Sequence, residues 1–215
     1  MKHCPIPFRN RPLPGFLHLP KDPPRAIMVL AHGSSAAGQE TPLVRDLADE
    51  LPKIGLAVLR FDFPFVSDGK KTPNSDPVLV EAYLAAMAEA RRVLPGVPVI
   101  AGGKSLGAKI ALRTSPEKSA GAVLCGFPLH PPGHAGTAAA CLLEQYTHPV
   151  LLIQGTRDAF ANQSLVREIV RAQRHISLHH VEGGDHSLRS PAGPAATMSG
   201  ILGAVDRWLQ TILTR

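Results

Sequence analysis

A serine stands at the centre of Gly103-Lys104-Ser105-Leu106-Gly107, after a short apolar run and before residues 108–112, which have helical character. A serine raised on a sharp turn between a strand and a helix needs small residues two positions away on either side, because the two elements approach closely there. Gly103 and Gly107 meet that demand. The segment therefore predicts a nucleophilic serine at position 105; a glycine-rich turn that happens to carry a serine is the alternative.

A serine hydroxyl is a poor nucleophile at neutral pH and needs a general base. If the chain order is serine, acid, histidine, both partners belong in later loops that follow strands. Asp158 follows the apolar run 150–153, and His186 follows the run 176–181. We therefore predict that Asp158 orients His186 and that His186 takes the proton of Ser105.

Two further carboxylates are rivals for the acid, Asp185 and Glu182. Neighbours in one loop rarely point so that one can bond the far ring nitrogen of the other, so Asp158 is favoured. Three more histidines lie on or at the edge of the run 176–181, where we interpret them as strand packing and surface: His175, His179 and His180. No carboxylate or cysteine completes a metal site with them, so no metal is expected.

The tetrahedral intermediate of acyl transfer needs two backbone N–H donors. One is predicted to be the amide of Leu106, the residue after the nucleophile. The other is expected in the loop after the apolar run 26–31, where Gly33 permits a tight turn and Ser34 follows, with Ser35 as the second choice. His32 is interpreted as a support for this loop.

Two segments follow strands that we expect to flank the nucleophile. Phe65 comes after the run 56–61 and His130 after the run 121–125, and both are candidate substrate-binding residues. Asp62 is interpreted as a structural hydrogen-bonding group within its loop. Lys104 could contact an acidic group of a substrate, but an exposed surface lysine is the commoner meaning.

The elements that must position these residues alternate along the chain. Short apolar runs occur at 26–31, 56–61, 97–101, 121–125, 150–153 and 176–181. Helical patterns begin near Thr41, Asp76 and Asn162, and the last spans residues 198–212. Such alternation predicts an α/β fold, with a mostly parallel sheet covered by helices on both faces.

The length of 215 residues predicts one domain, residues 1–215. Seven of the 21 prolines fall in residues 1–24, which allows at most an edge strand or hairpin around residues 15–19. The N-terminus lacks the apolar stretch of a signal peptide, and the apolar run 26–31 is too short to span a bilayer. Three cysteines without the spacing of a zinc or redox site suit a reducing compartment, so we expect a cytoplasmic protein.

The net charge of +6 raises the question of a nucleic-acid partner. The basic residues are scattered, the tightest runs are pairs, and ten aromatic residues form no evident base-stacking platform. Arg167, Arg171 and Arg174 share one helical face, which is typical of a solvated surface. We therefore expect neither a nucleic-acid nor a membrane partner, and the sequence leaves the oligomeric state open.

Taken together, these segments resemble the α/β-hydrolase fold from about residue 25 to residue 213. More narrowly, the chain is similar to a small hydrolase-like family related to dienelactone hydrolases, whose animal members include a testis-expressed protein and a subunit of a histone-acetyltransferase complex (NSL). The segments that carry this likeness are 32–34, 59–64, 102–107, 127–130, 155–158 and 184–187. Dienelactone hydrolases use a cysteine nucleophile, whereas position 105 here is serine, so the resemblance does not imply their substrate.

The resulting hypothesis is a serine hydrolase that needs no cofactor and cleaves small-molecule carboxylic esters or thioesters through an acyl-enzyme. Only about two dozen residues separate the runs that end near 125 and begin near 150, too few for a large cap domain, so small or exposed acyl groups are favoured. Two alternatives remain: a non-catalytic interaction module on a hydrolase scaffold, and a peptidase acting on short peptides.

Overall fold

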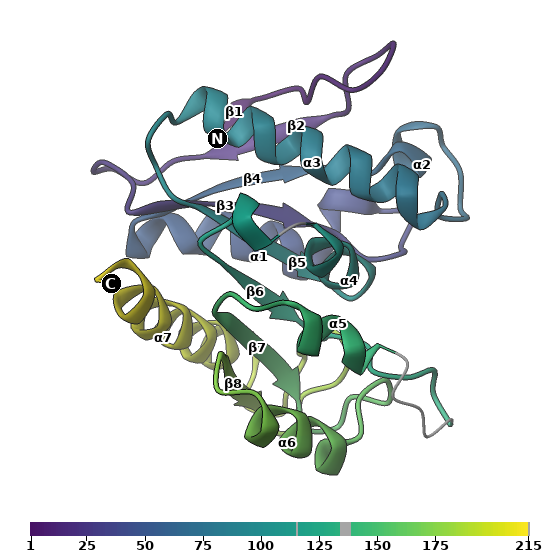
Figure 1. Ribbon diagram of the computed structural model, residues 1–215, viewed down its shortest axis with the longest axis vertical. Coiled ribbons are helices and arrows are strands. Elements are labelled where there is room, and N and C mark those ends of the chain that lie inside the picture. The colour runs from purple at the N-terminus through teal and green to yellow at the C-terminus, as the bar shows by residue number, and fades with distance from the viewer. Residues whose placement is uncertain (115, 134–138, 215) are drawn as a thin grey trace.

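The computed structural model describes residues 1–114, 116–133 and 139–214, and these residues form one eight-stranded sheet (Figure 1). The strand order is β1-β2-β4-β3-β5-β6-β7-β8. The strands are β1 (Lys2–His3), β2 (Gly15–His18), β3 (Ala26–Ala31), β4 (Leu56–Phe61), β5 (Val99–Lys104), β6 (Gly121–Cys125), β7 (Val150–Gly155) and β8 (Ile176–Val181). Strands β3 to β8 pair in parallel, while β1 and β2 form an antiparallel hairpin at one edge. The predicted mostly parallel α/β sheet is confirmed.

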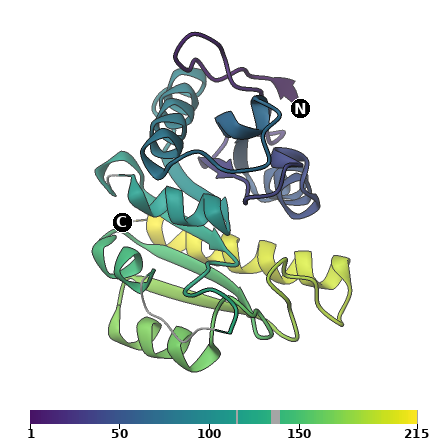
Figure 2. The same cartoon turned by 90° about the vertical axis from the view of Figure 1, so that its right-hand side faces the viewer.

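Helices cover both faces of the sheet (Figures 1 and 2). The α-helices are α1 (Pro42–Glu50), α2 (Pro64–Ser67), α3 (Asp76–Val93), α4 (Leu106–Arg113), α5 (Ala140–Gln145), α6 (Gln163–Ala172) and α7 (Pro194–Leu213). Short 3-10 turns occupy Gly38–Glu40, Leu51–Ile54 and Pro116–Lys118. Between β6 and β7, α5 is the one helix that the described residues form, so they include no large cap.

Two separate apolar cores follow from this layering. Helices α3, α4, α5 and α6 contribute to one core, in which Tyr83 is fully buried. Helices α1 and α7 contribute to the core on the opposite face, around Trp208. Because strands β3 to β7 are buried on both faces, their sequences are apolar runs rather than alternating patterns.

Strand β5 differs from the predicted range 97–101. It begins at Val99 and ends at Lys104, because its pairing with β6 continues to the register Lys104↔Cys125. Pro98, at the start of the apolar run, lies before the strand and accepts a hydrogen bond from the amide of Ile27. The longer strand places Ser105 directly at its carboxyl end.

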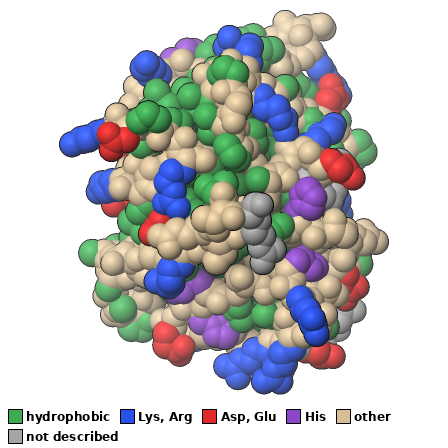
Figure 3. All heavy atoms as spheres, turned by 60° about the vertical axis from the view of Figure 1, so that its left-hand side comes forward, with side chains coloured by type: hydrophobic (Ala, Val, Ile, Leu, Met, Phe, Trp, Pro, Cys, Tyr) green, Lys and Arg blue, Asp and Glu red, His purple; other side chains and the backbone are tan. Residues whose placement is uncertain are grey.

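The proline-rich start of the chain forms the hairpin edge that the sequence allows. Strand β2 pairs antiparallel with β4, and an isolated bridge joins Ile6 and Leu13. The three cysteines are not in disulfides: Cys4 and Cys125 are buried and Cys141 is exposed. None of the helices that the structure describes is long and apolar enough to cross a membrane. On the face shown in Figure 3, basic side chains are spread among uncharged ones, with one small group at the lower edge.

Candidate active site

Ser105 sits on a strained turn between β5 and α4. Its φ of 54° and ψ of −111° lie outside the regions that non-glycine residues ordinarily occupy. A Cβ on Gly103 would lie 2.3 Å from the carbonyl carbon of Gly107, and a Cβ on Gly107 would lie 2.5 Å from the backbone oxygen of Ala31. The two glycines are therefore required by the close approach of strand and helix.

The structure brings Ser105, His186 and Asp158 into one hydrogen-bonded chain. The Nε2 atom of His186 lies 2.9 Å from the Oγ atom of Ser105. On the other side of the ring, Nδ1 lies 2.9 Å from Oδ2 and 3.0 Å from Oδ1 of Asp158. With Nδ1 protonated, Nε2 is free to accept the serine proton, which is the arrangement by which a serine hydroxyl is activated.

Asp158 is held in place by donors other than the histidine. Its side chain is fully buried, and its oxygens accept hydrogen bonds from Gln154 Nε2 at 2.5 Å and from the amide of Phe160 at 2.8 Å. A buried carboxylate needs such donors to offset its lost hydration. The ring of Phe160 lies over His186 with the ring centroids 4.3 Å apart. With these contacts the imidazole faces Ser105.

The two rival acids point elsewhere. Asp185 accepts hydrogen bonds from the amide of Ser187 at 2.8 Å, and from the amide and Nε of Arg189 at 3.0 and 2.8 Å. Burial alone would raise the pKa of Asp185, but these hydrogen bonds outweigh it and lower that pKa. Glu182 accepts a hydrogen bond from Thr156 at 3.3 Å. Asp185 thus shapes the loop that carries His186, while Asp158 contacts the imidazole.

The two predicted oxyanion donors flank Ser105. Leu106 is the first residue of α4, so its amide has no acceptor within the helix. A Cβ on Gly33 would lie 3.5 Å from the Cβ of Ser105, which puts the 32–35 loop directly beside the serine. Ser34 is exposed, and it lines the same pocket as Ser105 and Leu106.

His32 supports this loop from inside the protein. Its Nδ1 lies 2.6 Å from the carbonyl oxygen of Gly33, and its Nε2 accepts a hydrogen bond of 2.9 Å from the amide of Phe63. Nδ1 therefore carries the proton, and the ring is neutral. Burial lowers the pKa of His32 below its usual range, in agreement with that assignment.

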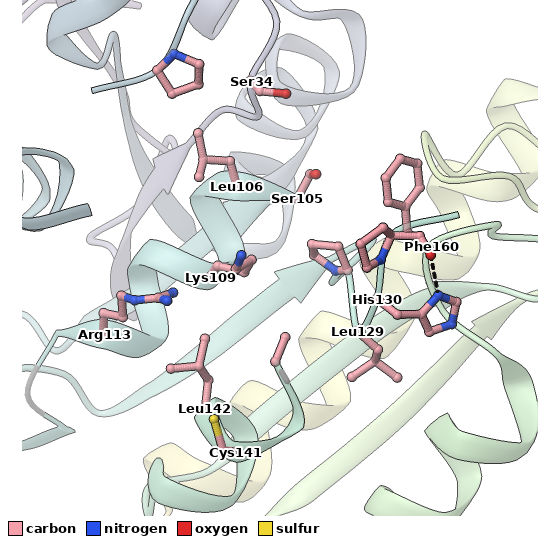
Figure 4. A pocket seen from close by; sticks show the side chains of 14 residues that line it. Ser34, Ser105, Leu106, Lys109, Arg113, Leu129, His130, Cys141, Leu142 and Phe160 are labelled. Atoms are coloured by element: carbon pink, nitrogen blue, oxygen red, sulfur yellow. Dashed lines mark hydrogen bonds between the residues drawn. The ribbon is translucent and has the colours of Figure 1, made fainter. Parts of the chain in front are cut away.

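A pocket of about 570 Å³ opens at the serine (Figure 4). Helix α4 forms one wall, and the segment 128–131 after β6 forms another, with Phe160 and residues of α5 completing it. A volume of this size suits a small organic substrate. Among the described residues, no group of three or more His, Cys, Asp or Glu side chains is placed to hold a metal ion.

Comparison with known proteins identifies the family of this chain. Residues 24–211 match the alpha/beta hydrolase domain family, which is most of the chain. This chain belongs to the α/β-hydrolase family. No curated protein matches it, and the narrower relationship to the testis-expressed and NSL proteins stays a prediction.

Solved structures of several other proteins share the fold of this chain. Est1E from Butyrivibrio proteoclasticus with bound ferulic acid is 15% identical, with a TM-score of 0.80 over 98% of this chain and 99% of that one. XC6422 from Xanthomonas campestris, described as a serine hydrolase without a lid, is 17% identical, with a TM-score of 0.77 over 98% and 94%. The dienelactone hydrolase from Anabaena variabilis is 18% identical, with a TM-score of 0.76 over 98% and 96%.

One predicted pocket residue of this hydrolase-family chain lies elsewhere. Phe65 is fully buried, with its ring 5.6 Å from that of His32 and stacked on Phe63 at 6.5 Å. The prediction assumed that the strand preceding Phe65 flanks the nucleophile. In the sheet β3 lies between β4 and β5, so Phe65 supports the packing around His32 and does not line the pocket.

His130 does line the pocket, as predicted. Its ring is fixed by Nδ1, 2.9 Å from the carbonyl oxygen of Pro131, and by Nε2, which accepts from the amide of Asn162 at 2.9 Å. The amides of Leu129 and His130 also donate to the carbonyl oxygen of Phe160, at 2.9 and 3.2 Å. His130 therefore ties one pocket wall to the loop that carries Asp158.

Asp62 and Lys104 lie outside the main pocket. The carboxylate of Asp62 accepts from the amide and the side chain of Gln39, at 2.8 and 3.0 Å, so its role is structural, but its partner lies in the turn after β3 and not in its own loop. The interpretation of Lys104 as an exposed surface residue is wrong. It is half-buried and lines a second cavity of about 510 Å³ on the α1 and α7 side, and burial lowers its pKa.

Sequence reasoning missed four residues that shape the site: Gln154, Phe160, Lys109 and Arg113. Gln154 and Phe160 have no sequence signal, because their roles depend on how the loop after β7 folds back on Asp158. Lys109 and Arg113 had one, since they stand four and eight residues after Ser105 on a predicted helix. That spacing puts all three on one face.

Proposed function

We propose that this chain is a serine hydrolase that cleaves small carboxylic esters. The hydrogen-bonded chain from Ser105 through His186 to Asp158 carries the proposal, because it supplies a nucleophile, a base and a group that orients the base.

In the proposed reaction, the Oγ atom of Ser105 attacks the ester carbonyl carbon while Nε2 of His186 accepts the hydroxyl proton. The resulting oxyanion accepts hydrogen bonds from the amides of Leu106 and Ser34. Collapse expels the alcohol, which takes the proton from His186. A water molecule then attacks the acyl-enzyme with the same base, releasing the carboxylic acid and restoring Ser105. Asp158 acts as a positioning residue that stabilises the imidazolium.

The size and openness of the pocket support small or exposed acyl groups. It holds about 570 Å³, and α5 is the one helix described between β6 and β7. The esterase domain of a Rhodothermus marinus protein shares the fold, which supports an ester as the substrate bond. Thioesters and short peptides use the same chemistry and are compared in the test.

The test is labelling of the purified protein with a fluorophosphonate, followed by intact-mass measurement. We expect one adduct on wild type, none on Ser105→Ala, and an unchanged adduct on Ser164→Ala, a control serine exposed on α6. If Ser105 is labelled, hydrolysis rates are then measured for an ethyl ester, a thioester and a peptide that carry the same acyl group. A folded wild-type protein without an adduct would contradict the proposal and favour a non-catalytic interaction module.

A further inference from the structure

A row of three side chains runs along one face of α4. Ser105, Lys109 and Arg113 are spaced by four residues each, so they face the same side of the helix. At about 1.5 Å of rise per residue, Lys109 lies about 6 Å and Arg113 about 12 Å along the axis from Ser105. All three line the pocket described above, and Figure 4 shows them on successive turns of its wall.

The pocket has two cations and no acidic side chain among the residues that line it. Arg113 places one nitrogen, Nη2, 3.1 Å from Asp76, which lies outside the pocket. This ion pair is partly exposed, and the guanidinium has N–H donors on its other nitrogens. Within the described parts of the chain, the Lys109 ammonium group makes no hydrogen bond or ion pair. The positive charge is therefore available to a ligand.

The rest of the lining near this row is apolar. Leu106, Leu129, Ala139, Leu142 and Phe160 contribute to it. An apolar lining with cations at one end fits a ligand with a hydrocarbon body and an anionic terminus. Such surroundings also strengthen the attraction between a cation and an anion, because less water screens it.

We propose that the substrate carries a carboxylate that binds Lys109 and Arg113, separated from the scissile ester by an apolar chain. The substrate class is then a monoester of a dicarboxylic acid, or an ester whose alcohol part bears the carboxylate. Hydrolysis consumes one water and releases the acid and the alcohol, and the bound carboxylate takes no part in bond making. The inference rests on the proposed ester hydrolysis and names its substrate.

The experiment compares charged esters with neutral esters of the same shape. The first series contains the monoethyl esters of glutaric, adipic and pimelic acid. Each is paired with a control ester in which a carboxamide replaces the free carboxylate. A second pair carries the charge on the alcohol: acetylated ω-hydroxyhexanoic acid and its carboxamide. The readout is the ratio of kcat/KM for the carboxylate to kcat/KM for the carboxamide.

We expect a ratio of about ten or more for the best chain length in one of the two series, as a charged hydrogen bond would supply. The ratio should fall as ionic strength rises. Lys109→Met and Arg113→Met should each lower the ratio several-fold. The effect of Arg113→Met should be largest for the longest chain, and Lys109→Arg should retain the ratio. Arg171→Met, which removes an exposed cation on α6, is the matched control and should leave it unchanged.

A wild-type ratio near one in both series would overturn the inference, as would a ratio that survives the Lys109→Met/Arg113→Met double variant. If the esters that carry a carboxamide are hydrolysed as efficiently as those that carry a carboxylate, the inference fails and the proposed function stands. If no ester is hydrolysed and no fluorophosphonate adduct forms, the proposed function fails and the inference fails with it.

Discussion

Two histidines lie in loops that follow the carboxyl ends of parallel strands, yet their surroundings differ. The side chain of His32, after β3, is fully buried, while that of His186, after β8, is 18% exposed. His32 bonds two backbone groups, the carbonyl of Gly33 and the amide of Phe63. His186 bonds two side chains, the hydroxyl of Ser105 and the carboxylate of Asp158.

The difference lies in what happens when a proton arrives. His32 has no carboxylate in hydrogen-bonding contact, since Asp62 is 3.8 Å away, and its Nε2 is already used by a backbone donor. Protonation would break that bond and bury a charge. His186 has a buried carboxylate on Nδ1 and a hydroxyl on Nε2, so a proton can move to it and be stabilised. Partners decide the role of a histidine more than its place at a strand end does.

The largest effect should come from removing His186. His186→Ala takes away the base, and we expect kcat for ethyl ester hydrolysis to fall by about 10⁴-fold or more, because members of such a chain act as a unit. Initial rates at saturating ester measure it, with Ser105→Ala for comparison. A loss of less than tenfold in folded protein would contradict the role of His186.

The two aspartates near His186 give the next contrast. Asp158→Asn should lower kcat by about 10³- to 10⁴-fold, because an amide cannot hold the ring in the same tautomer or stabilise its positive charge. Asp185→Asn should leave kcat within about threefold, since its carboxylate bonds only its own loop. The same ester assay checks both. An equal loss of kcat in the two variants would make Asp185 again a candidate for the acid that orients His186.

Removal of the buried histidine should affect stability. His32→Ala leaves the amide of Phe63 without its acceptor and opens a cavity beside Phe65. We expect the free energy of unfolding to fall by about 3 kcal/mol, which urea denaturation would measure. The comparison between the two histidines fails if this variant is as stable as wild type.

The pH dependence of stability should follow from the same burial. The pKa of His32 is lowered from its ordinary value of 6.5, so below about pH 7 the unfolded chain binds more protons than the folded protein. The contribution of this group to stability is therefore complete well above pH 6.5 and decreases as the pH falls through 6.5, by at most about 1.4 kcal/mol per pH unit. His18, His179 and His180, whose pKa values burial also lowers, act in the same direction.

A series of urea titrations between pH 7.5 and 5 would measure this slope in wild type and in His32→Gln. We expect a shallower slope in the variant, with a residual slope from the other histidines. A variant whose stability depends on pH as steeply as wild type would show that His32 is not the group that excludes the proton.

The smallest effect separates the aromatic packing from the pocket. Phe65→Leu should lower the free energy of unfolding by about 1 kcal/mol and leave KM for the ester unchanged, because the side chain is buried behind His32. Leu129→Ala, in the pocket wall, should raise KM. Steady-state kinetics on both variants would show which surface the substrate contacts. A raised KM in Phe65→Leu would contradict its placement in the core.

Sequence patterns predicted much of this molecule where short-range physics decides. The boundaries of β3, β4, β6 and β8 follow directly from apolar runs. The β5 boundary was displaced, because pairing with β6 rather than hydrophobicity determines where that strand ends. Phe65 was misplaced because nothing in the local sequence reveals that β3 separates β4 from β5, the strand that precedes Ser105.

By itself, the sequence determined the serine turn with its two glycines, the α/β alternation, and the strand-end positions of the acid and the base. These depend on steric limits and periodicity within a few residues. Only the tertiary structure decided which aspartate contacts His186, which histidine is buried, and which cations face the pocket. Those outcomes depend on strand order and on hydrogen bonds between residues far apart in the chain, such as Asp158 and His186, whose numbers differ by 28.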